Sequence, residues 1–444
     1  MNYISTVPFR MKVVLASLIF LFCLHVQAQR PNIIYIMADD MGFGDLSSYG
    51  NKNFSTPNLD KLALQGAKFV NAYSAGPLCT PTRAAFMTGR YPARTTVGLI
   101  EPLTNTKSDT SFGLTKDIPS IATLMKMGGY QTALVGKWHL GTRSQHSPVK
   151  NGFDYFFGFR SGAADYISHK GDGRQPDLYE NDSLVYSKGY LTDLFSDKAV
   201  AFIKQEHDKP FFLAVTFNAP HWPWQLQDSN VYDDSVNFRN GGSAAVYAGM
   251  MKSLDDGVGR IIKALDDEEL SRKTIVIFTN DNGGERYSDN GGLTNAKGSL
   301  WEGGIKVPAF VRWTGKIPPG SITHQVAVTM DWTATILAAG GSKGHIDYPI
   351  DGIDLMPMLL MTKKNVERPI YWRTFQRIKQ NAVRVGDWKY LKDEKGEYLF
   401  NLADDQGEKN DLKAREPAIL VKLKNRYADW EKTVLKPIPL QMEN

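Results

Sequence analysis

Four short apolar runs restrict the possible folds of this 444-residue chain more than any other feature. The runs are NIIYIMA from Asn32, TALVG from Thr132, FFLAVTF from Phe211 and TIVIFT from Thr274. Uninterrupted apolar runs of this length are typical of strands that are buried on both faces. Amphipathic stretches lie between them, including SIATLMKMGG from Ser120 and the helix-like run Ala245–Leu265. The alternation predicts an α/β fold with a mainly parallel sheet sandwiched by helices.

The composition changes near Ala338–Gly352, a stretch rich in glycine that is typical of a loop or a domain boundary. The segments AVRVGDWKYLKD and GEYLFNLADD, which follow it, predict short antiparallel strands, and an amphipathic helix is expected over Pro417–Val434. We therefore expect a catalytic α/β domain over residues 29–345. A small C-terminal α+β subdomain, an antiparallel sheet plus a helix, is expected over residues 346–444.

The first 28 residues have the features of a secretory signal peptide. Arg10 and Lys12 precede an apolar run, Val13–Val26, and the segment ends in small residues at Ala28. The run is too short for a comfortable membrane span, so we expect no stable membrane insertion. Phe22 before Cys23 does not fit a lipoprotein anchor. The sequence predicts cleavage after Ala28 and a periplasmic or secreted protein.

Charge and cysteine content narrow the function classes. The formal charge of +5 falls to about +3 once Arg10 and Lys12 leave with the signal, which is too weak for a nucleic-acid-binding surface. The mature chain keeps one cysteine, Cys79, and cannot form an internal disulfide. A small buried apolar side chain is one interpretation of Cys79.

Polar residues follow each of the four predicted strands: Asp39-Asp40, Lys137 with His139, His221, and Asp281-Asn282. In an open α/β sheet, ligands bind beyond the carboxyl ends of the strands, so these side chains are expected at one rim. Asp39, Asp40, Asp281 and Asn282 offer only oxygen ligands, which suit Ca²⁺ or Mg²⁺ rather than zinc. The alternative is that these pairs are turn or cap residues.

The segment around Cys79 is suited to binding an anion. A helix can begin just past Pro81, so that its backbone N–H groups and its dipole would face an oxyanion, with Arg83 one turn further on. Lys137 and His139 alternate on a strand extension, and Lys297 lies in NAKGSLWEGG. Together with His221 they favour a site that binds a polyanionic group and moves protons. Each could instead be structural or solvated.

These residues resemble a known family. Cys79-Thr-Pro-Thr-Arg83 is similar to the C-x-P-x-R core of the type I sulfatases, the arylsulfatase-like carbohydrate sulfatases whose cysteine is converted to formylglycine (3-oxoalanine). GYQTALVGKWHLG, residues 129–141, resembles the second signature of the family. Further matches are PNIIYIMADDMGFGDL, TNDNGG and KGSLWEGGIKVP, and together the matches span residues from about 31 to 310.

The resemblance implies an alkaline-phosphatase-like fold and a calcium ion bound by Asp39, Asp40, Asp281 and Asn282 together with an oxygen of the modified residue 79. A formylglycine-generating maturation enzyme is an implied partner. The hydrated aldehyde at position 79 would be the nucleophile that attacks sulfur.

The resemblance also implies roles for the remaining site residues. Arg83 and Lys137 would stabilise the modified side chain, and Lys297 would hold the sulfate oxygens. His221, alone or with Lys297, would protonate the departing alcohol. His139 would take a proton from the second hydroxyl of residue 79, which expels sulfate.

The expected activity is hydrolysis of sulfate esters on a carbohydrate, with algal polysaccharides such as ulvan or carrageenan as first candidates. Alternatives are a glycosaminoglycan sulfatase, a formylglycine-dependent phosphonate or phosphodiester hydrolase, and an inactive sulfated-glycan-binding protein. Near the position of Ala164, several carbohydrate sulfatases carry a histidine, so a substrate contact is expected to be missing or supplied elsewhere. The candidate substrate contacts are Trp222, Trp224, Arg143, Arg160, Ser161, His169 and Lys170.

Overall fold

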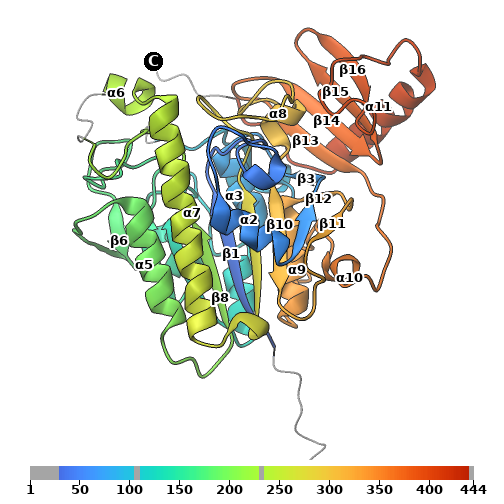
Figure 1. Ribbon diagram of the computed structural model, residues 1–444. Helices are drawn as coiled ribbons and strands as arrows, with labels where there is room; N and C mark the ends of the chain where they lie inside the picture. Colours follow the sequence, from blue (N-terminus) through green and yellow to red (C-terminus); the bar gives the residue numbers. More distant parts are fainter. Residues whose placement is uncertain (1–29, 105–110, 230–234, 440–444) are drawn as a thin grey trace, which may run out of the picture.

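A ten-stranded sheet lies at the centre of the computed structural model, which describes residues 30–104, 111–229 and 235–439 (Figure 1). The strand order is β11-β2-β10-β9-β1-β8-β4-β5-β6-β7. Its five central strands are parallel: β9 (Thr274–Asn280), β1 (Asn32–Ala38), β8 (Phe211–Thr216), β4 (Gln131–Lys137) and β5 (Tyr155–Phe159). All four predicted strands are among these five. The predicted signal peptide, with Cys23, lies outside the described residues.

Antiparallel pairs flank the parallel centre on both sides. On one side β10 (Ala309–Trp313) pairs antiparallel with β9 and with β2 (Ala67–Phe69), and β11 (Ser321–Thr323) runs parallel to β2. On the other side β6 (Leu178–Glu180) pairs antiparallel with β5, and β7 (Ser183–Leu184) pairs antiparallel with β6. The sheet is therefore mainly parallel where the site lies and mixed at its edges.

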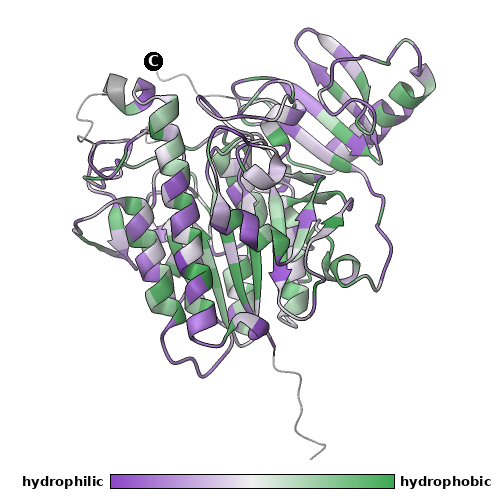
Figure 2. Ribbon diagram, in the orientation of Figure 1, coloured by the Kyte–Doolittle hydropathy of each residue, from purple (hydrophilic) through white to green (hydrophobic). Residues whose placement is uncertain are grey.

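Helices bury both faces of the sheet. In β1, Ile33, Tyr35 and Met37 pack on one side, and the residues between them pack on the other. The first face is covered by α3 (Cys79–Thr88), α4 (Ile121–Met127) and α9 (Thr329–Ala339). The second face is covered by α2 (Pro57–Leu64), α5 (Leu191–Ile203) and α7 (Ala244–Asp267). Figure 2 shows the expected mixture of polar and apolar residues along α7, because only one side of that helix meets the sheet.

Helix α3 begins earlier than the sequence suggested. We expected a start just past Pro81, but Cys79 is the first helical residue, with extended Leu78 before it. Proline is tolerated in the first helical turn because its missing N–H would have no partner within the helix. Gly89 ends the helix in the left-handed conformation, with φ of 66°. The early start places the side chain of residue 79 at the helix N-terminus.

The chain after the large sheet forms an antiparallel sheet, as predicted, and this sheet has four strands. Its strands are β13 (Ile370–Thr374), β14 (Gln380–Val385), β15 (Trp388–Asp393) and β16 (Gly396–Asn401). Helix α11 (Pro417–Glu431) packs on the sheet through Leu423, Tyr427 and Trp430. The apolar cluster that it joins continues into β3 (Ala72–Tyr73), β12 (Ala327–Val328), α8 (Glu302–Ile305) and α3. The division at residue 345 stays a prediction; α10 (Met356–Leu359) packs against the large sheet's core.

Among the described residues, no helix has both the length and the apolar character needed to cross a membrane.

Candidate active site

The candidate site lies at the carboxyl ends of the central strands. Asp39 and Asp40 follow β1, Lys137 is the last residue of β4, and Asp281 follows β9 directly. His221 lies in the loop after β8. Because β9, β1, β8 and β4 are neighbours and run parallel, their ends meet at one rim. Helix α3 brings Cys79 and Arg83 to the same rim.

Asp39 is the centre of the first group of charges. Its Oδ2 lies 2.6 Å from Lys137 Nζ and 3.3 Å from a terminal nitrogen of Arg83. The same Arg83 nitrogen lies 3.2 Å from Asp281 Oδ2, and the other donates to the Lys137 carbonyl at 3.0 Å. The Oδ1 of Asp39 lies 3.6 Å from Cys79 Sγ. Arg83 and Lys137 thus hold the carboxylate that faces the cysteine.

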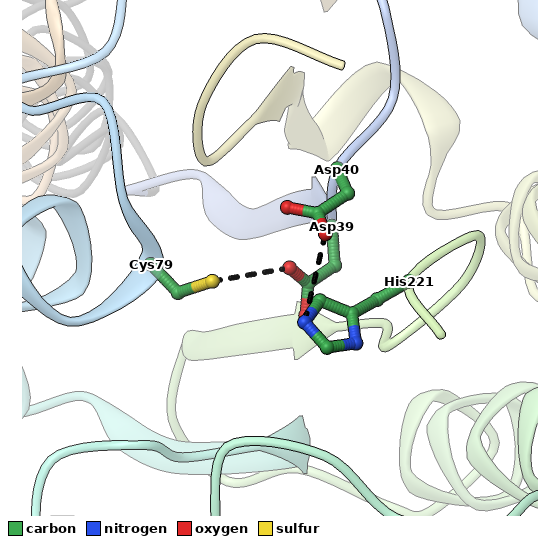
Figure 3. A group of neighbouring side chains, drawn as sticks. All are labelled: Asp39, Asp40, Cys79 and His221. Carbon is green, nitrogen blue, oxygen red and sulfur yellow. Dashed lines mark hydrogen bonds and ion pairs between the residues drawn. The ribbon is translucent and has the colours of Figure 1, made fainter. Parts of the chain in front are cut away.

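Asp40 is the centre of the second group. Its Oδ2 lies 2.6 Å from Lys297 Nζ and 3.5 Å from His221 Nε2, while its Oδ1 accepts from Asn282 Nδ2 at 2.8 Å. The backbone N–H of Asp40 donates to Asp281 Oδ1 at 3.2 Å, which joins the two groups. Figure 3 shows Asp39, Asp40, Cys79 and His221 pointing toward one another. One potential ligand atom from each of the four lies within 4.8 Å of the others.

The two histidines are held by backbone carbonyls, which can only accept hydrogen bonds. His139 Nε2 lies 2.9 Å from the Leu103 carbonyl, so Nε2 carries the hydrogen and Nδ1 is the basic nitrogen. That Nδ1 is buried without a hydrogen-bond partner among the described residues. His221 Nδ1 faces the carbonyl of Trp222, which leaves Nε2 toward Asp40 and Cys79. Each ring therefore presents one nitrogen for proton transfer.

Burial and neighbouring charges shift the pKa values of the site. Burial raises the pKa of the Cys79 thiol well above its usual value, although Lys137 and Lys297 oppose the shift. Burial, reinforced by Lys137, lowers the pKa of His221 to about 3 and also lowers the pKa of His139. Burial and the Asp39 charge raise the pKa of Asp281 to about 7. Both histidines are therefore neutral around pH 7, and the thiol is protonated.

The pKa values of Asp39 and Lys297 are shifted in the directions that favour the charged forms of these groups. Burial alone would raise the pKa of Asp39, but the charges of Lys137 and Arg83 hold it well below its usual range. Burial alone would lower the pKa of Lys297, but Asp40 raises it above its usual value. The Asp39 carboxylate and the Lys297 ammonium group are therefore charged around pH 7.

A cavity of about 600 Å³ opens above Cys79. Lys297, His139, His221 and Trp222 line it, as the sequence suggested for a substrate site. The other polar side chains that line the cavity lie on loops or outside the recognised motifs, and no sequence pattern identified them: Thr104, Asp172, Arg239, Glu285 and Arg377. Arg377 belongs to the C-terminal sheet region, and nothing in its local sequence suggests that it reaches the cavity.

Several expected substrate contacts have other partners. Arg160 is buried against Asp182 and lies over the ring of Tyr179. Ser161 Oγ donates to the Ala163 carbonyl. His169 bonds the Gly189 carbonyl, and Trp224 is buried against Tyr287.

Three other positions add no contact to this cavity. Arg143 and Lys170 are not among its lining residues, and Ala164 is buried in the core. Of the expected sugar-binding residues, Trp222 alone lines the cavity.

The family model described as Sulfatase matches residues 31–342. The chain belongs to the sulfatase family. It is 35% identical over 386 residues to N-acetylgalactosamine-6-sulfatase of Rattus norvegicus, covering 81% of this chain and 71% of the relative. It is also 35% identical over 381 residues to an arylsulfatase of Hemicentrotus pulcherrimus, covering 81% and 67%.

A solved structure described as Ps i-CgsB in complex with k-i-k-neocarrahexaose resembles the sulfatase chain throughout. The TM-score is 0.82 at 33% identity, over 92% of this chain and 94% of the other. The predicted fold, alkaline-phosphatase-like with a small C-terminal α+β subdomain, is confirmed by this likeness and by the topology. The predicted enzyme class is confirmed as well: the protein is a sulfatase and hydrolyses sulfate esters.

Proposed function

We propose that this sulfatase acts on a sulfated carbohydrate after Cys79 has been converted to formylglycine. The observation that carries the proposal is the position of Cys79, buried at the base of the cavity and facing Asp39, with Lys297, His139 and His221 beside the same cavity. The buried thiol is protonated at neutral pH, and a protonated thiol is a poor nucleophile. Formylglycine at position 79 would supply a hydrated aldehyde, whose hydroxyl is the nucleophile toward sulfur.

The residues at the rim also fit a calcium ion. Asp39, Asp40, Asp281 and Asn282 provide the oxygen donors that Ca²⁺ prefers. The Oδ1 of Asn282 is buried and has no hydrogen-bond partner among the described residues, which a cation would remedy. When bound, calcium would orient residue 79 and offset the negative charge of the sulfate ester.

The chain's own side chains divide the remaining work. Lys297 lines the cavity and is positioned to bind a sulfate oxygen. Arg83 and Lys137 hold Asp39 in place beside residue 79. Together with the charged Lys297 ammonium group, which contacts the same Asp40 Oδ2, His221 Nε2 would pass a proton to the departing alcohol, and His139 Nδ1 would accept a proton from residue 79.

A carrageenan-type oligosaccharide is the first candidate substrate. The solved relative that aligns with nearly the whole chain was crystallised with neocarrahexaose. A glycosaminoglycan is the second candidate, because the curated relative at 35% identity is an N-acetylgalactosamine-6-sulfatase. Trp222 beside the catalytic histidine offers an aromatic face for a sugar ring in either case.

Export and maturation complete the proposal. A chain with the signal-like segment at residues 1–28 would act in the periplasm or outside the cell, where polymeric sulfated glycans are found. The implied partner is a formylglycine-generating enzyme that acts on the segment around Cys79.

The proposal is tested on protein produced with and without such a maturation enzyme. Peptide mass spectrometry should find residue 79 lighter than cysteine by the difference between a thiol and an aldehyde. The matured protein should release sulfate from at least one carrageenan or glycosaminoglycan oligosaccharide, and the unmatured protein from none. Equal activity of the two preparations would refute the formylglycine mechanism.

Calcium has a readout that does not depend on activity. Adding Ca²⁺ should raise the melting temperature, and Asn282→Ala should reduce this rise. A melting temperature insensitive to Ca²⁺ would count against the ion.

A further inference from the structure

The turn between β13 and β14 reaches from the C-terminal sheet into the candidate active site. Arg377 and Ile378, in the middle of this turn, line the same cavity as Cys79 and Lys297. Cys79 is buried at the base of the cavity, whereas Arg377 is exposed. A guanidinium group is thus presented at the rim of a cavity whose base is built for sulfate.

A buried carboxylate anchors this turn. Glu101 Oε2 accepts from the backbone N–H groups of Phe375 and Gln376 at 2.9 and 3.0 Å, and the N–H of Glu101 donates to Gln376 Oε1 at 2.7 Å. Glu101 is only 6% exposed. Charge-assisted bonds to two successive N–H groups restrain the backbone on which Arg377 lies.

Glu101 belongs to the segment that also orients His139, the proposed catalytic base. Two residues after Glu101, the carbonyl of Leu103 holds His139 Nε2. The N–H of Leu103 in turn donates to Thr80 Oγ1, next to Cys79. The turn that carries Arg377 is therefore attached to the residues that surround the reacting group.

Arg377 lacks the partners that other arginines in the protein have. Arg83 and Arg160 are bound to carboxylates, while the described residues provide no hydrogen bond or ion pair for the side chain of Arg377. A second exposed arginine on the cavity wall, Arg239, lies over the ring of Trp222 at 5.8 Å. Two arginines at the rim leave guanidinium groups available to an anion on the ligand.

We propose that Arg377, assisted by Arg239, forms a subsite for a second anionic group of the substrate, a sulfate or carboxylate on the sugar next to the one that loses its sulfate. Glu101 is its positioning residue. The guanidinium fork can bind either anion, because both a carboxylate and a sulfate present two anionic acceptor oxygens on one atom. The inference rests on the proposed carbohydrate substrate and implies a preference for polyanionic oligosaccharides over singly sulfated sugars.

The test compares substrates that differ in their second anion. N-acetylgalactosamine 6-sulfate and the chondroitin 6-sulfate disaccharide differ by a carboxylate, and kappa- and iota-carrageenan tetrasaccharides differ in the number of sulfates. 4-Nitrophenyl sulfate serves as the reference with a single anion. The pair that the wild type discriminates identifies whether the second group is a carboxylate or a sulfate.

Arg377→Gln should reduce the wild-type preference for the polyanionic member about tenfold, through KM rather than kcat. Arg377→Lys should recover part of the preference because it keeps the charge. Lys379→Gln is the matched control: Lys379 lies on the same turn but over the ring of Phe375, and it should retain the preference.

The positioning role of Glu101 is tested by comparing a variant that removes its hydrogen bonds to the turn with one that keeps an acceptor oxygen. Glu101→Ala should reduce the preference as Arg377→Gln does, and Glu101→Gln should retain most of it, because an amide oxygen still accepts from the turn. Combining Glu101→Ala with Arg377→Gln should add little to either single change. Additive losses would show that Glu101 does not act through Arg377.

Different results would refute the proposed carbohydrate function and the proposed Arg377 subsite. If the matured wild type releases sulfate from none of the oligosaccharides, the carbohydrate function fails, and the subsite with it. If the wild type releases sulfate but Arg377→Gln discriminates between the substrates as the wild type does, the subsite alone is refuted.

Discussion

Two clusters of buried charges have opposite designs, although Lys297 of one lies only a few residues before Glu302 of the other. In the active-site cluster, Lys297 faces Asp40 beside an open cavity. We call the second cluster the interface cluster, because it joins α8 to the C-terminal sheet. In it, Lys389 Nζ of β15 lies 2.9 Å from Glu302 Oε1 of α8 and 2.8 Å from Glu408 Oε1. All three side chains of the interface cluster are buried. Both clusters are built from carboxylates and lysines in similar contact.

The difference lies in which buried polar atoms lack a partner of any kind, because Glu408 Oε1, which accepts no hydrogen bond, still lies 2.8 Å from Lys389 Nζ. The active-site cluster leaves His139 Nδ1 and Asn282 Oδ1 buried without hydrogen-bond partners among the described residues, and it borders the cavity. In the interface cluster, Tyr73 donates to Glu302 Oε2 at 2.7 Å, and the N–H of Glu302 donates to Glu408 Oε2 at 2.6 Å. Unused buried donors and acceptors cost stability and are expected where a ligand completes them. Buried charge alone therefore does not identify a functional site.

The largest expected effect is a loss of activity when Cys79 is replaced in the active site. Cys79→Ala should reduce sulfate release by a factor on the order of 10⁴ or more, because it removes the proposed precursor of the nucleophile. The melting temperature should stay close to that of the wild type, since alanine suits the start of α3. Sulfate release and thermal unfolding measure the two effects. Near-normal turnover in this variant would contradict the mechanism.

A smaller loss should follow from removing the proposed acid. His221→Ala should lower kcat by about 10²–10⁴-fold on a sugar sulfate, because the poor alcohol leaving group needs a proton. On 4-nitrophenyl sulfate the loss should be less, since nitrophenolate leaves without one. Steady-state kinetics on both substrates gives the comparison, and equal losses would exclude the acid role.

Breaking the interface cluster should act on stability instead. Lys389→Met leaves the Glu302 and Glu408 carboxylates buried without their cation, and should cost about 3–5 kcal/mol in the free energy of unfolding. Urea denaturation measures this cost, while kcat per folded molecule should hardly change. Lys252→Met, which removes an exposed ion pair with Asp256 on α7, is the control and should cost less than about 0.5 kcal/mol.

The smallest expected effect is a change in how the stability of the protein depends on pH. Burial raises the pKa of Glu408 from 4.5 to about 7, although Lys389 opposes the shift. The folded state therefore binds this proton more tightly than the unfolded chain, so Glu408 costs stability as pH rises from about 4.5 through 7. Relative to the wild type, Glu408→Gln should gain on the order of 1–3 kcal/mol between pH 4.5 and 7.5. Thermal unfolding at both values tests it; parallel profiles would contradict the assignment.

Local patterns were sufficient for much of the fold. The run from Asn32 predicted β1 with its bounds, because a strand buried on both faces needs an unbroken apolar sequence. The start of α3 was predicted too late, because Pro81, the third helical residue, was interpreted as lying before the helix. The polar residues after each strand were found because parallel strands end at a shared rim.

The sequence by itself determined the sulfatase family, the sheet, and the residues from Asp39 to Lys297 that meet at its rim, because each lies in a local motif or directly after a strand. Only the tertiary structure decided that Arg160 is bound to Asp182, that Arg377 reaches the cavity, and that Glu101 holds the turn. These contacts join segments up to 275 residues apart. No local pattern encodes such a contact, because a charged loop residue has the same sequence signature whether it meets solvent, a carboxylate or a substrate.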